Sequence, residues 1–67
     1  MKVEIKNLVP GYLFKAFDED NGWVTVQVIE AGNGRVLLRD EDGLDQGWRW
    51  SVSIKDVGNI EHFKPIE

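Results

Sequence analysis

Carboxylates are the most concentrated chemically active groups in this sequence. Seven of its twelve acidic residues fall in two short stretches, Asp18-Glu19-Asp20 and Asp40-Glu41-Asp42 with Asp45. Paired carboxylates can exchange protons or bind a hard cation when a fold brings them together. These stretches lack the apolar neighbours that prepare a carboxyl group for proton transfer. An EF-hand loop starting at Asp18 would need a bidentate glutamate at the position of Ile29. We therefore expect solvated acidic turns.

Histidine, cysteine and serine offer little other chemistry. The sequence contains no cysteine, which excludes disulfides and thiolate ligands, and His62 alone cannot build a zinc site. Ser51 and Ser53 precede His62 by about ten residues, a spacing that assembles no nucleophile with its base. No glycine-rich phosphate loop leads into a helix. We therefore predict a protein that is not an enzyme, with no metal and no cofactor.

The stretch Gly22–Asp40 predicts a hairpin around which the other elements are arranged. Its first half alternates β-branched and polar residues, the period of a strand with one buried face. The inward residues of this first half are Val24, Val26 and Val28. Gly32-Asn33-Gly34 supplies the turn, and Val36 and Leu38 continue the inward pattern on the returning strand. Leu37 interrupts the alternation, which indicates a strand covered on both faces.

Further strand signals stand on both sides of this hairpin. They cover Tyr12–Phe17, Trp48–Ser53 and Asn59–Phe63. Ser53 and Asp56 have the spacing of a capping box, and Gly58 is a stop signal, so a single helical turn is expected at residues 54–57. Pro65 is expected to end regular pairing, because proline has no amide hydrogen to donate.

Length and composition indicate one small globular domain. The chain has 67 residues, of which 42% are hydrophobic and 30% charged. We expect a single domain over residues 1–67, with a barrel core at 9–63 and an N-terminal strand or arm at 1–8. No apolar run approaches the ~20 residues of a membrane span, and the N-terminus has no signal-peptide core. A cytoplasmic protein without a membrane segment is therefore expected.

Short strands with frequent turn signals predict an all-β domain. The order of elements resembles an SH3-like barrel and is most similar to the Tudor-like subgroup. It runs from a Pro-Gly turn through an acidic loop, a Trp-led strand and a Gly turn to a single helical turn before the last strand. The residues that carry the resemblance are Gly11, Phe14, Ala16, Trp23, Val26, Val28, Val36, Asp40, Gly43, Val57 and Ile60. The resemblance implies a single small barrel of five to six antiparallel strands.

Tudor domains that read methylated lysine or arginine enclose the cation in an aromatic cage at one end of the barrel. The corresponding positions of this sequence are Asp18, Val24, Arg39 and Asp42, and none of them is aromatic. The resemblance thus implies a binding module, whereas these residues predict that it does not read methyl marks.

Charge is expected to divide the surface. The loops after the first and third strands lie at the same end of a barrel meander, which gathers the acidic residues into one rim. The outward strand positions carry the cations Lys15, Arg35, Arg39 and Arg49. A cationic stripe with Thr25 and Gln27 between its members is a candidate nucleic-acid surface, although a net charge of −4 weakens phosphate attraction. Cross-strand salt bridges are the alternative role of these cations.

Aromatic residues suggest a second surface. Trp48 and Trp50 share one face, and so small a core has room for one of them, so we expect Trp50 inside and Trp48 at the mouth. Trp23 and Phe17 are expected to lie near each other across the first hairpin. Exposed aromatic clusters mark contact surfaces, or they cover the ends of a small core.

These features predict a non-enzymatic protein-interaction module, an acidic adaptor or inhibitor that docks on a basic partner or on a second copy. The predicted partner-binding residues are Phe17, Trp23, Trp48, Asp18, Asp20, Asp40 and Asp42. Self-association would use the Met1–Asn7 strand at an exposed sheet edge. The alternative function is nucleic-acid binding through the outer cations Lys15, Arg35, Arg39 and Arg49.

Overall fold

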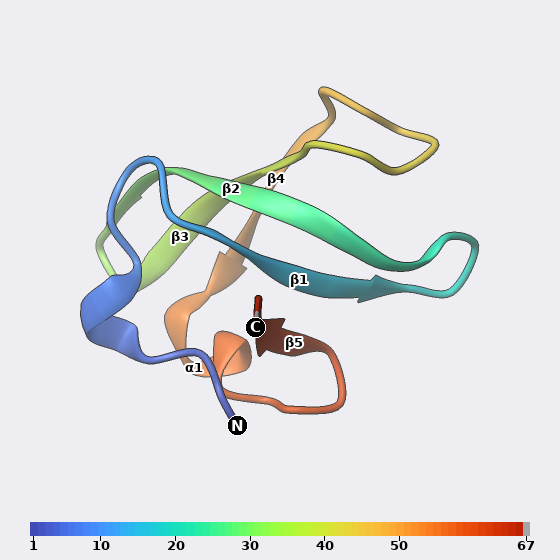
Figure 1. Cartoon of the computed structure of the whole chain (residues 1–67). Helices are drawn as coiled ribbons and strands as arrows, with labels where there is room; N and C mark the ends of the chain where they lie inside the picture. The colour runs from blue at the N-terminus through green and yellow to red at the C-terminus, as the bar shows by residue number, and fades with distance from the viewer. Residues whose placement is uncertain (67) are drawn as a thin grey trace.

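One antiparallel sheet of five strands forms most of the domain in the computed structural model, which describes residues 1–66 (Figure 1). The strands are β1 (Leu13–Asp18), β2 (Gly22–Gly32), β3 (Arg35–Asp40), β4 (Arg49–Ser53) and β5 (Phe63–Pro65). They lie in the order β4-β3-β2-β1-β5. A 3-10 helix, η1 (Ile5–Asn7), precedes the sheet, and the helical turn α1 (Ile54–Val57) separates β4 from β5. The predicted all-β class and the helical turn before the last strand are confirmed.

The central hairpin is formed by β2 and β3. Gly32 pairs with Arg35, so the turn consists of Asn33 and Gly34 alone. Their φ angles are 54° and 76°. Two successive positive φ angles are typical of a type I′ turn, whose twist matches that of the flanking strands. The Asn-Gly pair therefore sets this hairpin's geometry locally.

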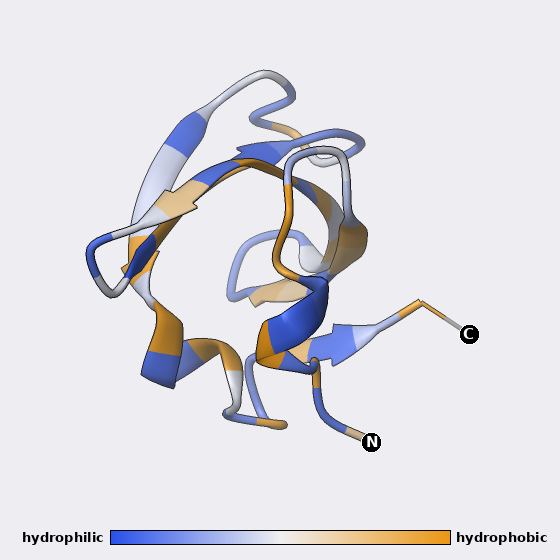
Figure 2. Cartoon of the chain, turned by 90° about the vertical axis from the view of Figure 1, so that its left-hand side faces the viewer, coloured by the Kyte–Doolittle hydropathy of each residue, from blue (hydrophilic) through white to orange (hydrophobic). Residues whose placement is uncertain are grey.

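A β-bulge bends the long strand β2. Its pairing with β3 passes from Val28 opposite Leu38 to Glu30 opposite Leu37, so Ile29 is the extra residue. A bulge increases local twist and bends the strand that carries it. This bend contributes to the curled shape of the sheet (Figure 2).

The core lies on the concave face of the curled sheet. Buried and exposed residues alternate along β1, β2 and β3, as the sequence pattern predicted. The buried apolar residues are Val3, Leu8, Phe14, Ala16, Val24, Val26, Val28, Val36, Leu38, Val57 and Phe63. Trp50 and Val52 of β4 pack against this cluster. Leu37, on the opposite face, is half-buried, so β3 is partly covered on both sides.

The N-terminal segment was expected to be a strand or an arm, and the structure shows an arm that contains η1 and no strand. The amide of Asn7 donates to the Glu4 carbonyl, and the amide of Leu8 donates to the Ile5 carbonyl, both at 3.0 Å. These bonds close the turns of η1. Val3 and Leu8 are buried, but the Ile5 side chain is 66% exposed. Val3 and Leu8, and not Val3 and Ile5, therefore face the core, which begins before residue 9.

The last strand begins later than predicted. Residues 59–62 form a turn in which the amide of Phe63 donates to the Asn59 carbonyl at 2.9 Å. Strand β5 follows, with Pro65 opposite Phe14. Proline is tolerated there because β5 is at the edge of the sheet, where one backbone side has no strand to pair with. The prediction of a strand at Asn59–Phe63 is therefore wrong by several residues.

The helical turn α1 coincides with the predicted residues 54–57. The hydroxyl of Ser53 accepts a hydrogen bond from the amide of Lys55, which caps the first turn. Strands β1 and β4 each begin one residue later than expected. Neither helical element of residues 1–66 is long and apolar enough to cross a membrane.

Candidate functional site

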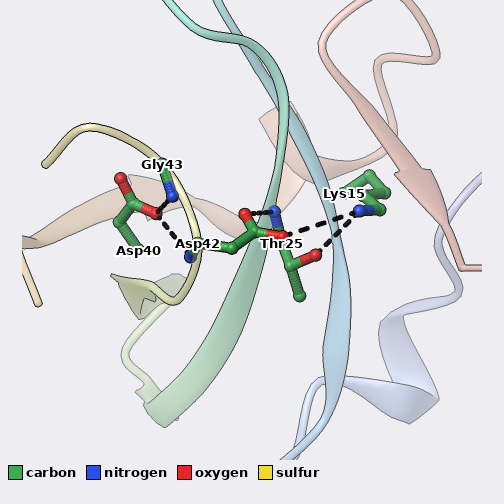
Figure 3. Close-up of polar contacts among 5 residues, drawn as sticks. All are labelled: Lys15, Thr25, Asp40, Asp42 and Gly43. Carbon is green, nitrogen blue, oxygen red and sulfur yellow. Dashed lines mark hydrogen bonds and ion pairs between the residues drawn. The ribbon is translucent and has the colours of Figure 1, made fainter. Parts of the chain in front are cut away.

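The two acidic loops meet at one end of the sheet, as predicted. The amide of Leu44 donates to Asn21 Oδ1 at 3.0 Å, which joins the β3–β4 loop to the β1–β2 turn. The amide of Thr25 donates to Asp42 Oδ1 at 2.7 Å and ties the same loop to β2 (Figure 3). Because these contacts link distant residues, they set the shape of this end.

Asp40 organises the loop that follows β3. The residue is 4% exposed, and its Oδ1 accepts hydrogen bonds from the amides of Asp42 at 3.1 Å and Gly43 at 2.7 Å (Figure 3). Its backbone amide donates to the Trp48 carbonyl at 2.9 Å, and its carbonyl accepts from the Gly47 amide at 2.7 Å. Asp40 therefore closes both ends of the loop, a role that the sequence did not reveal.

A cavity of about 260 Å³ opens at this end, and we call it the mouth site. Its lining residues are Ala16, Phe17, Asp18, Val24, Asp40, Asp45, Trp48 and Trp50. Most of them stand at the alternate strand positions whose side chains face the concave side of the sheet. On β1 these positions include Ala16 and Asp18, and on β3 they include Leu38 and Asp40. The mouth site thus unites three carboxylates and three aromatic residues from β1, β3, β4 and the β3–β4 loop.

Hydrogen bonds stabilise the ionised form of the Asp18 carboxylate. Its Oδ1 accepts from the amide of Asp20 at 2.8 Å, and its Oδ2 accepts from the side-chain amide of Asn21 at 3.1 Å. The bond from the Asp20 amide, followed by that from Asn21, holds the pKa of Asp18 below its usual value. This carboxylate therefore carries its charge well into the acid range.

The two tryptophans of the mouth site differ in exposure. Trp50 is half-buried and packs against the core, whereas Trp48 is 66% exposed. The backbone amide of Trp48 donates to the Asp45 carbonyl at 2.8 Å. The loop thus holds an exposed indole at the cavity. This arrangement agrees with the expectation for both side chains.

The structure places some of the predicted partner-binding residues in the lining of the mouth site and others outside it. Phe17 reaches the mouth site, but its ring also contacts Trp23 edge-on at a centroid distance of 5.5 Å. Trp23 alternates with the buried Val24 and so lies on the convex face of the sheet, outside the cavity lining. Of the remaining residues, Asp18, Asp40 and Trp48 line the cavity.

The other two predicted carboxylates, Asp20 and Asp42, do not line the cavity. Asp20 is exposed in the β1–β2 turn. Asp42 holds the Thr25 amide and lies 4.0 Å from Lys15 Nζ. Sequence reasoning placed Trp50 only in the core and missed Asp45, although Trp50 stands on the inward row of β4 and Asp45 belongs to the acidic loop.

The predicted outer cations do lie on the convex face. Lys15 Nζ donates to Thr25 Oγ1 at 2.8 Å. Arg39 Nη1 lies 2.6 Å from Glu41 Oε2, and Arg49 stands directly opposite Arg39 in the β3–β4 pairing. Arg35, near the hairpin turn, donates to the Ser51 carbonyl at 3.1 Å. Lys15 and Arg35 thus form cross-strand hydrogen bonds, whereas the ion pairs of Lys15 and Arg39 join them to Asp42 and Glu41 of the β3–β4 loop and are not the expected cross-strand salt bridges.

His62 and the possibility of a metal site are the remaining chemical features of the described part of the chain. The exposed His62 ring lies 3.0 Å from the Asn59 side-chain amide. Within residues 1–66, no group of three or more histidine, aspartate or glutamate side chains is placed to hold a metal ion.

Searches against protein-family models, curated proteins and solved structures found no match for this chain. Its function is therefore inferred from the geometry of its own surfaces.

Proposed function

We propose that this chain is an SH3-like protein-interaction module that binds a basic segment of a partner protein at the mouth site. The observation that carries the proposal is the convergence of Asp18, Asp40 and Asp45 with three aromatic residues around one cavity. In the proposed complex, a lysine or arginine side chain of the partner enters this cavity.

Electrostatics favours a cation at this position. Carboxylates on several sides of a partly enclosed cavity focus a negative potential there. The faces of aromatic rings attract cations as well, by ~0.5 to 2 kcal/mol according to exposure. Hydrogen bonds lower the pKa of Asp18, so its negative charge persists at more acid pH than that of an ordinary aspartate. A neutral or anionic group would lose these interactions, so the mouth site selects for positive charge.

The size of the cavity favours one side chain over a whole ligand. Its volume of about 260 Å³ falls below the ~300 to 1,000 Å³ that pockets for drug-sized molecules have. A flexible lysine or arginine side chain can enter while the rest of the partner segment contacts the rim. The exposed Trp48 indole offers apolar area for that contact.

The SH3-like assignment is supported by the order of elements. Five antiparallel strands, with α1 between β4 and β5, agree with the barrel pattern that the sequence resembles. An acidic module of this kind can act as an adaptor, or as an inhibitor that covers the basic surface of its partner.

A titration with a lysine-rich peptide tests the proposal. We expect binding that weakens as salt rises, and clear loss of affinity in Trp48→Ala and Asp45→Asn, both of which alter the cavity lining. Leu44→Ala is the matched apolar control, because Leu44 lies in the same loop, is 84% exposed and does not line the cavity. Glu19→Gln is the matched charge control in the other acidic loop.

Tryptophan fluorescence or calorimetry gives the affinity, and circular dichroism establishes that each variant folds. Equal affinity of all four variants, or tighter binding of a glutamate-rich peptide than of the lysine-rich one, would disprove the proposed site. Asp40 is unsuitable as the first target, because its loss would also disturb the loop.

A further inference from the structure

The convex face of the sheet carries two pairs of like charges. Lys15 on β1 stands directly opposite Lys64 on β5, and Arg39 on β3 stands directly opposite Arg49 on β4. Like charges at directly opposite positions destabilise an antiparallel pair. Lys64 was not among the expected outer cations, because the last strand was expected to end before this residue.

The β3–β4 loop neutralises one member of each pair. Asp42 Oδ2 lies 4.0 Å from Lys15 Nζ, and Glu41 Oε2 lies 2.6 Å from Arg39 Nη1. Among residues 1–66, no carboxylate lies within 4.0 Å of the exposed Arg49 guanidinium. Positive charge therefore persists on both sides of this face, although the whole chain is acidic.

Aromatic rings adjoin the first pair. Lys64 Nζ lies over the Trp23 ring, 4.3 Å from its centroid, and Phe17 contacts Trp23 edge-on. Both rings are partly exposed, at 44% for Phe17 and 37% for Trp23. A shallow hollow of about 280 Å³ lies beside them, lined by Lys15, Lys64, Pro65 and Ile66.

We infer that this face binds single-stranded nucleic acid, with a phosphate between Lys15 and Lys64, a base on the Trp23–Phe17 pair, and a further phosphate near Arg39 and Arg49. This surface carries positive charge, whereas the mouth site carries negative charge, and the two sites share Phe17. The pairs lie on β1/β5 and β3/β4, so their midpoints are three interstrand spacings apart, or ~14 Å across the sheet. A flexible single strand can span that distance with its bases free to stack.

The combination of aromatic rings and cations favours a single-stranded nucleic acid over a duplex or an acidic peptide. Bases of a single strand are free to stack on aromatic side chains, whereas the bases of a duplex are already stacked within it. An acidic peptide would meet the cations but would gain nothing from Trp23 and Phe17. The carboxylates at the mouth repel phosphate and so confine the strand to the convex face.

The test uses the whole chain and an oligothymidylate of about ten nucleotides, within the range of known single-strand sites. We expect fluorescence quenching of tryptophan and a binding constant that falls linearly on a log–log plot against salt. Neutralisation of the two proposed phosphates gives a slope of about −1.4.

Three variants and one control locate the site. Arg49→Ala and Lys64→Ala should each make the slope shallower by about 0.7, the share of one phosphate contact. Trp23→Ala should weaken binding about tenfold through lost stacking. Lys55→Ala, which removes an exposed cation from α1, should change neither quantity.

The inference is overturned by absent binding at low salt, by equal effects of Lys55→Ala and Arg49→Ala, or by equal affinity for duplex DNA or polyglutamate. The Arg49 side chain makes no hydrogen bond or ion pair within residues 1–66, so Arg49→Ala should fold normally. This variant therefore tests the site even if Trp23→Ala does not fold. Trp48→Ala should leave oligonucleotide affinity unchanged, which separates this site from the mouth site.

Discussion

Asp40 Oδ1 accepts a hydrogen bond from the Gly43 amide at 2.7 Å, and the two residues are packed so closely that a side chain at position 43 has no room. A Cβ added to Gly43 would lie 2.6 Å from Asp40 Oδ2 and 2.9 Å from Val24 Cγ1. The loop that forms one wall of the mouth site therefore requires glycine for space.

Gly43→Ala is expected to destabilise the domain by about 1 to 3 kcal/mol, the usual cost of overpacking a tight site. Either Asp40 or the loop backbone must move to admit the methyl group. Chemical denaturation monitored by tryptophan fluorescence measures the effect. Gly32→Ala is the matched control, because a Cβ there meets no atom within 4 Å. Equal stability of Gly43→Ala and Gly32→Ala would contradict this account of the loop.

Asp40→Ala and Asp40→Asn separate the structural role of Asp40 from its charge. Alanine removes the acceptor of the Asp42 and Gly43 amides, and a lost partner costs about 1 to 3 kcal/mol per poorly solvated group. Asparagine keeps an oxygen at this place, so its loss of stability should be clearly smaller. Thermal unfolding of the two variants gives the comparison. If both variants unfold at the same temperature, the hydrogen bonds of Oδ1 do not hold the loop.

Local sequence signals were sufficient to predict much of the fold. The valine alternation of β2 identifies its buried face because side chains alternate in any strand. The Asn33-Gly34 turn and the Ser53 cap depend on residues within a few positions of each other, so the hairpin and α1 could be placed without tertiary information. The acidic loops were also expected at one end, because antiparallel connectivity brings alternate loops together.

Contacts between distant residues could not be predicted in this way. The buried Asp40 carboxylate is held by two amides of its own loop, and the shape of that loop depends on contacts with Asn21 and Thr25 from other segments. The place of Lys64 opposite Lys15 depends on where β5 begins, which the turn at residues 59–62 decides. The grouping of Trp23 with Trp48 has a different cause, because the alternation of β2 already places Trp23 on the face opposite the buried Val24.

The turn between β2 and β3 gives a prediction about backbone conformation. Gly34 has a φ angle of 76°, in the left-handed region, so Gly34→Ala is expected to cost about 1 to 2 kcal/mol. Asn33 has a φ angle of 54°, and Asn33→Gly should be close to neutral because glycine adopts this region freely. Denaturant midpoints of the two variants test this contrast. A loss in Asn33→Gly as large as that in Gly34→Ala would show that φ is not the deciding factor.

Asp42 makes the stability of the domain depend on pH. Its carboxylate accepts the Thr25 amide at 2.7 Å, and this bond, with a smaller contribution from Lys15, lowers the pKa of Asp42 below its ordinary value of 3.8. A lowered pKa in the folded state means that the ionised carboxylate favours folding. The stabilisation is fully present above the pKa of the unfolded chain, and it is lost as pH falls through the lower pKa of the folded state.

Asp42→Asn should therefore be less stable than the natural sequence near pH 7, and the difference should shrink below about pH 4, where the unfolded-state carboxyl also takes up its proton. Urea denaturation at several pH values between neutral and strongly acid measures both curves. Glu19→Gln, which removes one charge from an exposed side chain, controls for net charge. The difference in free energy of unfolding between Asp42→Asn and the natural sequence could instead stay constant from pH 7 to pH 3. That result would mean that the Thr25 amide does not stabilise the ionised form of Asp42 over its neutral form.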